Sequence, residues 1–263
     1  MRMFTEVINI AFVEILLFEL AVLSCHGSTD SYDQEWFTSK ADLRKTTKRI
    51  SNFQNGFILG RNVITNIDGR WPDTTIPYVL DETYEEEDRE AIRSAMDEFE
   101  KQTCISWVER SEEEAYVEIQ NDMGCQSEIG YKGQVQTISL EAPLCMSKGR
   151  IMHELMHTLG FLHEHSRSDR DDYVYVVWDN VQEGYEADFQ ALPPDLIDDL
   201  DVEYDYKSVM HYTSRSYSRN PPNPTLLPTN ADVNPNELGY GLKNGVLTDL
   251  DVEKINKFYE CDS

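Results

Sequence analysis

The sequence is poor in basic residues. It has 23 lysines and arginines against 49 aspartates and glutamates among 263 residues, for a formal net charge of −26. A chain this acidic repels the phosphates of nucleic acids and the headgroups of anionic membranes. We therefore expect no nucleic acid as a partner. The acidity favours solubility, and attraction of basic peptides is an alternative interpretation of it.

The sequence also lacks a long uninterrupted hydrophobic run. Its most apolar N-terminal stretch, residues 10–23, is short and contains Glu14 and Glu19, whereas a membrane-spanning helix needs about 20 apolar residues. A weakly positive start and small residues after the stretch are typical of a secretory signal. We predict a signal peptide over residues 1–25, no membrane anchor, and a secreted, extracellular protein.

Cysteine is scarce, and none of the five cysteines forms a C-x-x-C pair. A zinc site made of cysteines is therefore not expected. Cys25 lies at the end of the predicted signal peptide. The other four cysteines are an even set, and a secreted protein favours disulfides over free thiols. Three pairings are open to this set: it consists of Cys104, Cys125, Cys145 and Cys261.

A histidine motif, H-E-x-x-H-x-x-G-x-x-H, begins at His153. On a helix, His153 and His157 leave the same face and can bind one ion. Gly160 permits a sharp turn, which returns His163 as a third nitrogen ligand. Three imidazoles and one open position describe a catalytic zinc site, because a structural site fills all four positions with protein. Glu154 is well placed to hold a water molecule. A helix with scattered histidines is the alternative, and five fixed positions argue against it.

Two later segments carry a family resemblance. Residues 164–174, which follow His163, are similar to the extension H-E-x-x-R-x-D-R-D-x-Y-V, and residues 208–212 read Ser-Val-Met-His-Tyr. With the histidine motif, they resemble the astacin family of zinc metalloendopeptidases, which belong to the metzincins. The resemblance extends from about Arg61 to Cys261. It implies an α+β fold in two lobes: an N-terminal lobe with a twisted sheet and two long helices, and a mostly irregular C-terminal lobe that ends in one helix.

The resemblance also implies roles for single residues. Glu154 would be the general base that takes a proton from a zinc-activated water. Tyr212 would be a further zinc ligand that swings away to hydrogen-bond the transition-state oxyanion, although a packed aromatic is the alternative. Met210 would form an apolar floor beneath the metal. We expect His165 and His211 to be structural, because three histidines already complete the motif.

Charge divides the chain ahead of this domain. Residues 26–61 have a net charge of +2, and residues 62–263 have a net charge of −26. A mildly basic segment before an acidic domain suits an inhibitory pro-segment that is held partly by long-range attraction. The alternative is a disordered leader without a role. We predict a pro-segment over residues 26–61 and a catalytic domain over residues 62–263.

The resemblance places the activation cleavage after Arg61, so that Asn62 becomes the new N terminus. Glu164 would anchor that N terminus inside the protein, and a surface carboxylate is the alternative. Astacin pro-segments often carry F-x-G-D, but residues 53–56 read Phe-Gln-Asn-Gly. This pro-segment therefore lacks the aspartate that keeps such enzymes latent.

The implied disulfides are Cys104–Cys261 and Cys125–Cys145. The chain ends two residues after Cys261, so we expect no further C-terminal module. Apolar stripes, alternation and a Thr248 cap predict helices over residues 85–102 and 147–159, a last helix from residue 248, and strands over residues 116–119 and 135–140.

These observations predict a secreted zinc endopeptidase of polypeptide substrates, made as a zymogen, with one Zn²⁺ per chain and as a monomer. A catalytically dead binding protein is a rival, which loss of Glu154 or of a histidine ligand would signal; all are present. A zinc hydrolase of small molecules is a second rival, and a small closed pocket would favour it.

Overall fold

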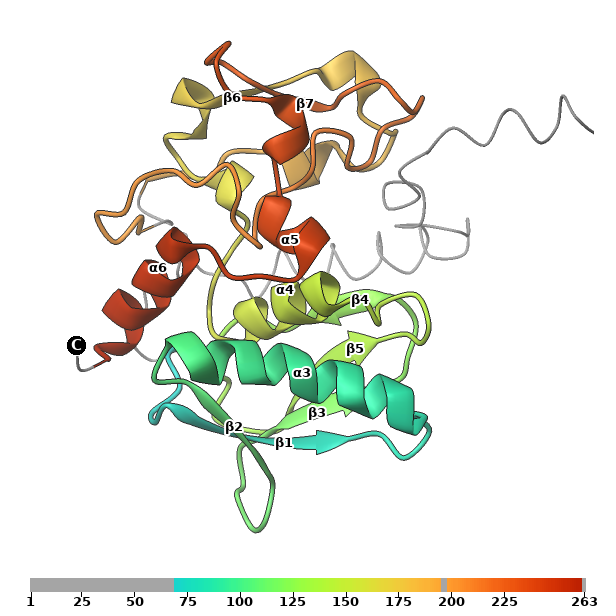
Figure 1. Cartoon of the computed structure of the whole chain (residues 1–263), viewed down its shortest axis with the longest axis vertical. Helices are drawn as coiled ribbons and strands as arrows, with labels where there is room; N and C mark the ends of the chain where they lie inside the picture. Colours follow the sequence, from blue (N-terminus) through green and yellow to red (C-terminus); the bar gives the residue numbers. More distant parts are fainter. Residues whose placement is uncertain (1–68, 195–197, 262–263) are drawn as a thin grey trace, which may run out of the picture. The chain divides into compact units, whose positions relative to one another are not determined.

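The computed structural model describes residues 69–194 and 198–261. The predicted signal peptide, the pro-segment and the Arg61–Asn62 junction lie outside these residues. Figure 1 shows the described helices and strands, which in chain order are β1 (Thr75–Leu80), α3 (Glu86–Gln102), β2 (Ser106–Glu109), β3 (Val117–Gln120), β4 (Cys125–Ser127), β5 (Gln136–Leu140), α4 (Lys148–Thr158), β6 (Val174–Val176), β7 (Leu226–Pro228), α5 (Tyr240–Asn244) and α6 (Asp249–Tyr259).

A five-stranded sheet organises the first half of the described chain, in the order β2-β1-β3-β5-β4. The first four of these strands run parallel, and β4 pairs antiparallel with β5 at the edge. Parallel strands need cover from helices, and α3 and α4 lie beside the sheet in Figure 1. The inward side chains of β3, Val117 and Ile119, are fully buried. The predicted strands in this region are confirmed within one or two residues.

Helix α3 confirms the predicted amphipathic helix. Its buried residues recur at helical spacing and are Ile92, Ala95, Met96 and Phe99. Three acidic residues occupy its first turn, where the helix dipole favours negative charge. The apolar stripe therefore belongs to the core and not to a ligand site.

Helix α4, the predicted zinc helix, is buried along almost its whole length. A side chain at Gly149 would bring its Cβ to 1.8 Å from the backbone oxygen of Leu242 in α5. Glycine at this position therefore lets the backbone of α5 pack directly on α4. At the other end, Gly160 has a φ of 104°, a left-handed conformation that glycine adopts readily. The sharp turn that the motif predicts is confirmed.

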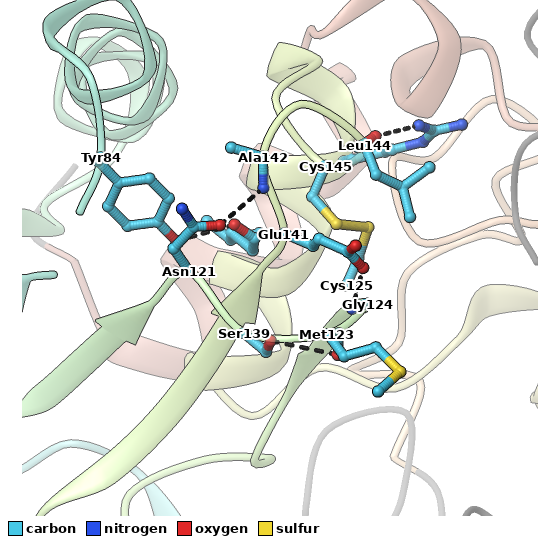
Figure 2. Close-up of a disulfide and its surroundings, with 12 residues drawn as sticks. Tyr84, Asn121, Met123, Gly124, Cys125, Ser139, Glu141, Ala142, Leu144 and Cys145 are labelled. Atoms are coloured by element: carbon cyan, nitrogen blue, oxygen red, sulfur yellow. Dashed lines mark hydrogen bonds between the residues drawn. A yellow bond between two sulfur atoms is a disulfide. The ribbon is translucent and has the colours of Figure 1, made fainter. Parts of the chain in front are cut away.

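The loop that leads into α4 is fastened to the sheet (Figure 2). The Cys125–Cys145 disulfide ties the loop to edge strand β4. The backbone N–H of Ala142 donates to the side-chain oxygen of Asn121 at 2.9 Å. These links fix where α4 begins, and through it where the histidines lie.

The second half of the described chain is largely irregular and has a hydrophobic cluster of its own. The buried members of this cluster are Val174, Val181, Tyr185, Phe189, Tyr204, Tyr212, Leu226 and Leu238. The chain then enters α6, whose N-cap Thr248 accepts a hydrogen bond from the Asp251 N–H as predicted. A second disulfide, Cys104–Cys261, joins the end of α6 to the segment after α3. Both implied disulfides are thus present.

A helix that spans a bilayer needs about 20 predominantly apolar residues. Among the helices that the structure describes, none is both long enough and apolar enough to cross a membrane.

Candidate metal centre

Three histidines converge at the end of α4. One ring nitrogen from each of His153, His157 and His163 lies within 4.8 Å of the others. The Nε2 atoms of His153 and His163 are 3.1 Å apart. Nitrogens bound tetrahedrally at about 2.1 Å from zinc lie roughly 3.4 Å apart, so the donor set fits this ion. The spacing that the sequence predicts is therefore realised in space, and the three residues are positioned to bind one metal ion.

Backbone carbonyls orient two of the three rings. The Nδ1–H of His153 donates to the carbonyl oxygen of Val209 at 2.9 Å. The Nδ1–H of His157 donates to the carbonyl oxygen of Phe161 at 2.7 Å. A carbonyl can only accept, so each ring carries its proton on Nδ1 and leaves the Nε2 lone pair for a metal.

Burial keeps these imidazoles neutral. It lowers the pKa of His153 to about 4 and that of His157 to about 3. Both rings are therefore neutral at neutral pH, with one proton on Nδ1, and Nε2 need not lose a proton before it binds a cation.

Glu154 lies next to the first ligand and is 3% exposed. Burial raises the pKa of its carboxyl to about 8, because a charged carboxylate is poorly solvated in this surrounding. A divalent cation on the three histidines acts in the opposite direction, since positive charge nearby favours the ionised form. The pKa of this carboxyl in a metal-loaded site is therefore set by these two opposing effects.

The predicted Met-turn lies against this centre. Met210 is 2% exposed, and its carbonyl oxygen accepts a hydrogen bond from the N–H of Glu164 at 3.0 Å. Its own N–H donates to the hydroxyl of Ser208 at 2.9 Å. The turn is therefore fixed to the residue that follows the third histidine.

Tyr212 packs on the third histidine. The ring centroids of Tyr212 and His163 are 4.7 Å apart, and the Tyr212 and His165 rings stack at 3.9 Å. The ring of Tyr217 also lies against Tyr212, with ring centroids 5.3 Å apart. Tyr217 could not be singled out from the sequence, since no motif contains it.

The other two histidines of this region have structural partners. His211 is fully buried; one ring nitrogen bonds to the Tyr204 hydroxyl at 2.7 Å, and the other to the Tyr212 carbonyl at 2.6 Å. His165 donates from Nε2 to the backbone oxygen of Asp188 at 3.0 Å. Neither belongs to the converging set, which agrees with the structural role expected for them.

Glu164 is buried among donors and is 1% exposed. Its carboxylate accepts from Lys254 Nζ at 2.6 Å, from the Asp205 N–H at 2.9 Å and from Arg167 Nη1 at 3.4 Å. The two cations lower the pKa of Glu164 against the effect of its burial. It is therefore not a surface carboxylate. Sequence reasoning missed Lys254, because its apolar neighbours in α6 indicate only a core helix.

The site agrees with comparisons with known proteins. Residues 63–260 match the family model described as Astacin, a peptidase family. The chain is 41% identical over 212 residues to zinc metalloproteinase nas-14 of Caenorhabditis elegans, which is 80% of this chain and 41% of that protein. It is 41% identical over 243 residues to the astacin-like metalloendopeptidase of Gallus gallus, which is 89% of this chain and 57% of that protein.

A solved structure supports the same assignment. The hatching enzyme zinc-protease HCE-1 of Oryzias latipes, also called high choriolytic enzyme 1, aligns with a TM-score of 0.67 and 34% identity, over 73% of this chain and 94% of that one. By contrast, this chain spans only 41% and 57% of the lengths of the two relatives above. The matched region contains the three histidines, the Met-turn and the mixed α/β fold around them. The chain therefore belongs to the astacin family of peptidases.

Proposed function

We propose that this chain is a secreted zinc-dependent endopeptidase that hydrolyses peptide bonds in polypeptides. The observation that carries the proposal is the convergence of His153, His157 and His163, with the buried carboxyl of Glu154 next to the first of them. A dead binding protein would have no need of that carboxyl. The relatives named metalloproteinases add support.

The residues divide the chemistry among themselves. When bound, zinc supplies a water of lowered pKa and polarises the scissile carbonyl. Glu154 takes the proton from the attacking water and delivers it to the leaving amine. Tyr212 directs its hydroxyl toward the oxygen on which negative charge develops. Met210 contributes an apolar surface beneath the ligands and takes no part in proton transfer.

The two-lobed arrangement belongs to the same proposal. The sheet with α3 and α4 would form one lobe, and the irregular chain after His163 the other, with the substrate in a cleft between them. The chain after His163 has a hydrophobic cluster separate from the main core, which supports this division. An open cleft suits a polypeptide better than a small molecule.

Tyr212→Phe tests the oxyanion role. Removal of the hydroxyl should lower kcat with little change in KM, because the hydroxyl acts mainly in the transition state. Loss of one such donor costs about 10²- to 10³-fold in kcat in other enzymes. Steady-state kinetics on a quenched peptide measure this effect. Tyr175→Phe, at a tyrosine that is 49% exposed, is the matched control and should behave as wild type. An unchanged kcat in Tyr212→Phe would remove Tyr212 from the mechanism.

Activation is the second part of the proposal. We expect a zymogen in which cleavage between Arg61 and Asn62 opens the site and frees an ammonium group that reaches Glu164. Lys254 and Arg167 already offset the charge of Glu164. Residues left ahead of Asn62 should therefore impair the enzyme only modestly.

The activation experiment compares the chain before and after trypsin. Uncut chain from residue 26 should show little hydrolysis. After the cut, N-terminal sequencing should read Asn62, and mass spectrometry of the products should show cleavage at internal bonds of an end-blocked peptide. Full activity of the uncut form would contradict the zymogen proposal but not the endopeptidase. Release of terminal residues alone would contradict the proposal that the chain is an endopeptidase.

A further inference from the structure

Two charged residues of α6 point into the protein beneath the metal centre. Asp251 is fully buried and Lys254 is 3% exposed. They lie three residues apart and so share one face of the helix. Buried charges carry a large desolvation cost unless they are well paired. Their partners show what this face of the helix holds in place.

Asp251 holds the Met-turn. One carboxylate oxygen accepts from the hydroxyl of Ser208 at 2.6 Å, and the other accepts from the N–H of Val209 at 3.0 Å. The second oxygen also accepts from the N–H of Thr248 at 3.1 Å, the residue that caps α6. The same carboxylate therefore closes the start of the helix and fixes the turn, which lies about forty residues earlier in the chain.

The residue clamped by Asp251 is the one that orients a metal ligand. The N–H of Val209 donates to the carboxylate of Asp251. The carbonyl oxygen of Val209 accepts a hydrogen bond from Nδ1 of His153 at 2.9 Å. If Val209 shifted, the His153 ring would lose the hydrogen bond that fixes its tautomer and its orientation. Groups that hydrogen-bond a metal ligand directly, as the carbonyl of Val209 does here, typically contribute 10- to 100-fold in metal affinity.

Lys254 holds the other side of the centre. Its ammonium pairs with the carboxylate of Glu164 at 2.6 Å, in a pair that is almost completely buried. Glu164 follows the third histidine and donates its N–H to the carbonyl of Met210 at 3.0 Å. One turn of α6 therefore contacts both Val209, which orients His153, and Glu164, which follows His163.

We propose that Asp251 and Lys254 are positioning residues, which act from α6 to hold the Met-turn and Glu164 so that the histidines stay aligned for zinc. The proposal rests on the proposed function, since it concerns the same metal. It accounts for two buried charges that a helix serving only as core would not need.

Zinc affinity of the full chain is the test, measured by competition with a chelator at a temperature well below unfolding. We expect the dissociation constant to rise on the order of tenfold in Asp251→Ala. Asp251→Asn keeps the volume of the side chain and one hydrogen-bond acceptor, so it should lose less zinc affinity than Asp251→Ala. Lys254→Met keeps the apolar stem, removes the ammonium from Glu164, and should also weaken zinc binding. If Asp251→Ala does not fold, Asp251→Asn and Ser208→Ala carry the test.

Ile255→Val is the matched control, because Ile255 is fully buried in the same helix and its side chain has no polar atom that could join these contacts. It should lower the melting temperature and leave zinc affinity within about twofold of wild type, since it touches none of the hydrogen bonds behind the ligands. Unchanged affinity in Asp251→Ala, or equal weakening in Ile255→Val, would overturn the positioning role. Failure of the unsubstituted chain to bind zinc would instead overturn the proposed function, and with it the role of these residues.

Discussion

Replacement of Glu154 by glutamine is expected to abolish nearly all peptide hydrolysis and to leave the zinc in place. Glutamine keeps the size of the side chain but cannot take a proton from water, and it does not alter the three histidines. General acid–base catalysis contributes about 10²- to 10⁴-fold, so kcat/KM should fall by a factor within that range. Because this carboxyl serves both the attack and the leaving group, we expect the upper part of the range.

The measurement pairs kcat/KM with metal analysis of the same sample. Glu90→Gln, at an exposed glutamate of α3, is the control and should match wild type in both. A zinc-loaded Glu154→Gln chain with near-normal turnover would show that another group moves the proton.

Replacement of His163 by alanine should empty the metal centre. It removes one of three protein ligands, and with it both the affinity and the geometry for zinc. His211→Ala is the matched comparison, since it removes a buried neutral histidine nearby. That variant loses two hydrogen bonds, to Tyr204 and to the Tyr212 backbone. It should cost about 1–3 kcal/mol of stability and retain most of its zinc.

Metal content by mass spectrometry, with thermal unfolding alongside, separates the two variants. If His211→Ala lost the metal and His163→Ala kept it, the third ligand would be wrongly assigned.

The metal centre could be predicted because its information is local. His153 and His157 are one helical turn apart, and Gly160 marks the turn that returns His163. The same holds for α3, whose apolar stripe is visible in the sequence, and for the Thr248 cap of α6. The pairing of the four cysteines followed only from the family resemblance, since their spacing leaves three pairings open.

Strand β1 is not among the elements predicted from the sequence, and it contains Pro77. Proline lacks an N–H and argues against a strand inside a sheet. In the structure, Pro77 pairs in register only with Val108 of β2, and pairing with β3 begins at Tyr78. The missing donor is tolerated at a position where the strand has a neighbour on one side. This compensation depends on the register of two other strands, which the local sequence does not contain.

The second role of Asp251 was missed for a similar reason. The predicted Thr248 cap is present, and Asp251 is its partner in the capping box. Its contacts with Ser208 and Val209 join segments more than forty residues apart. Lys254 and Glu164 are 90 residues apart. Such contacts arise only when α6 packs on the Met-turn, so no local pattern indicates them.

The most direct test of the account is a zinc titration of the activated chain. After removal of metal by a chelator, hydrolysis of internal peptide bonds should vanish. It should return in proportion to added zinc and reach its plateau at one equivalent per chain, because His153, His157 and His163 form one site. Hydrolysis that persists in metal-free protein, or a zinc-loaded activated chain that cleaves no peptide, would contradict the central claim.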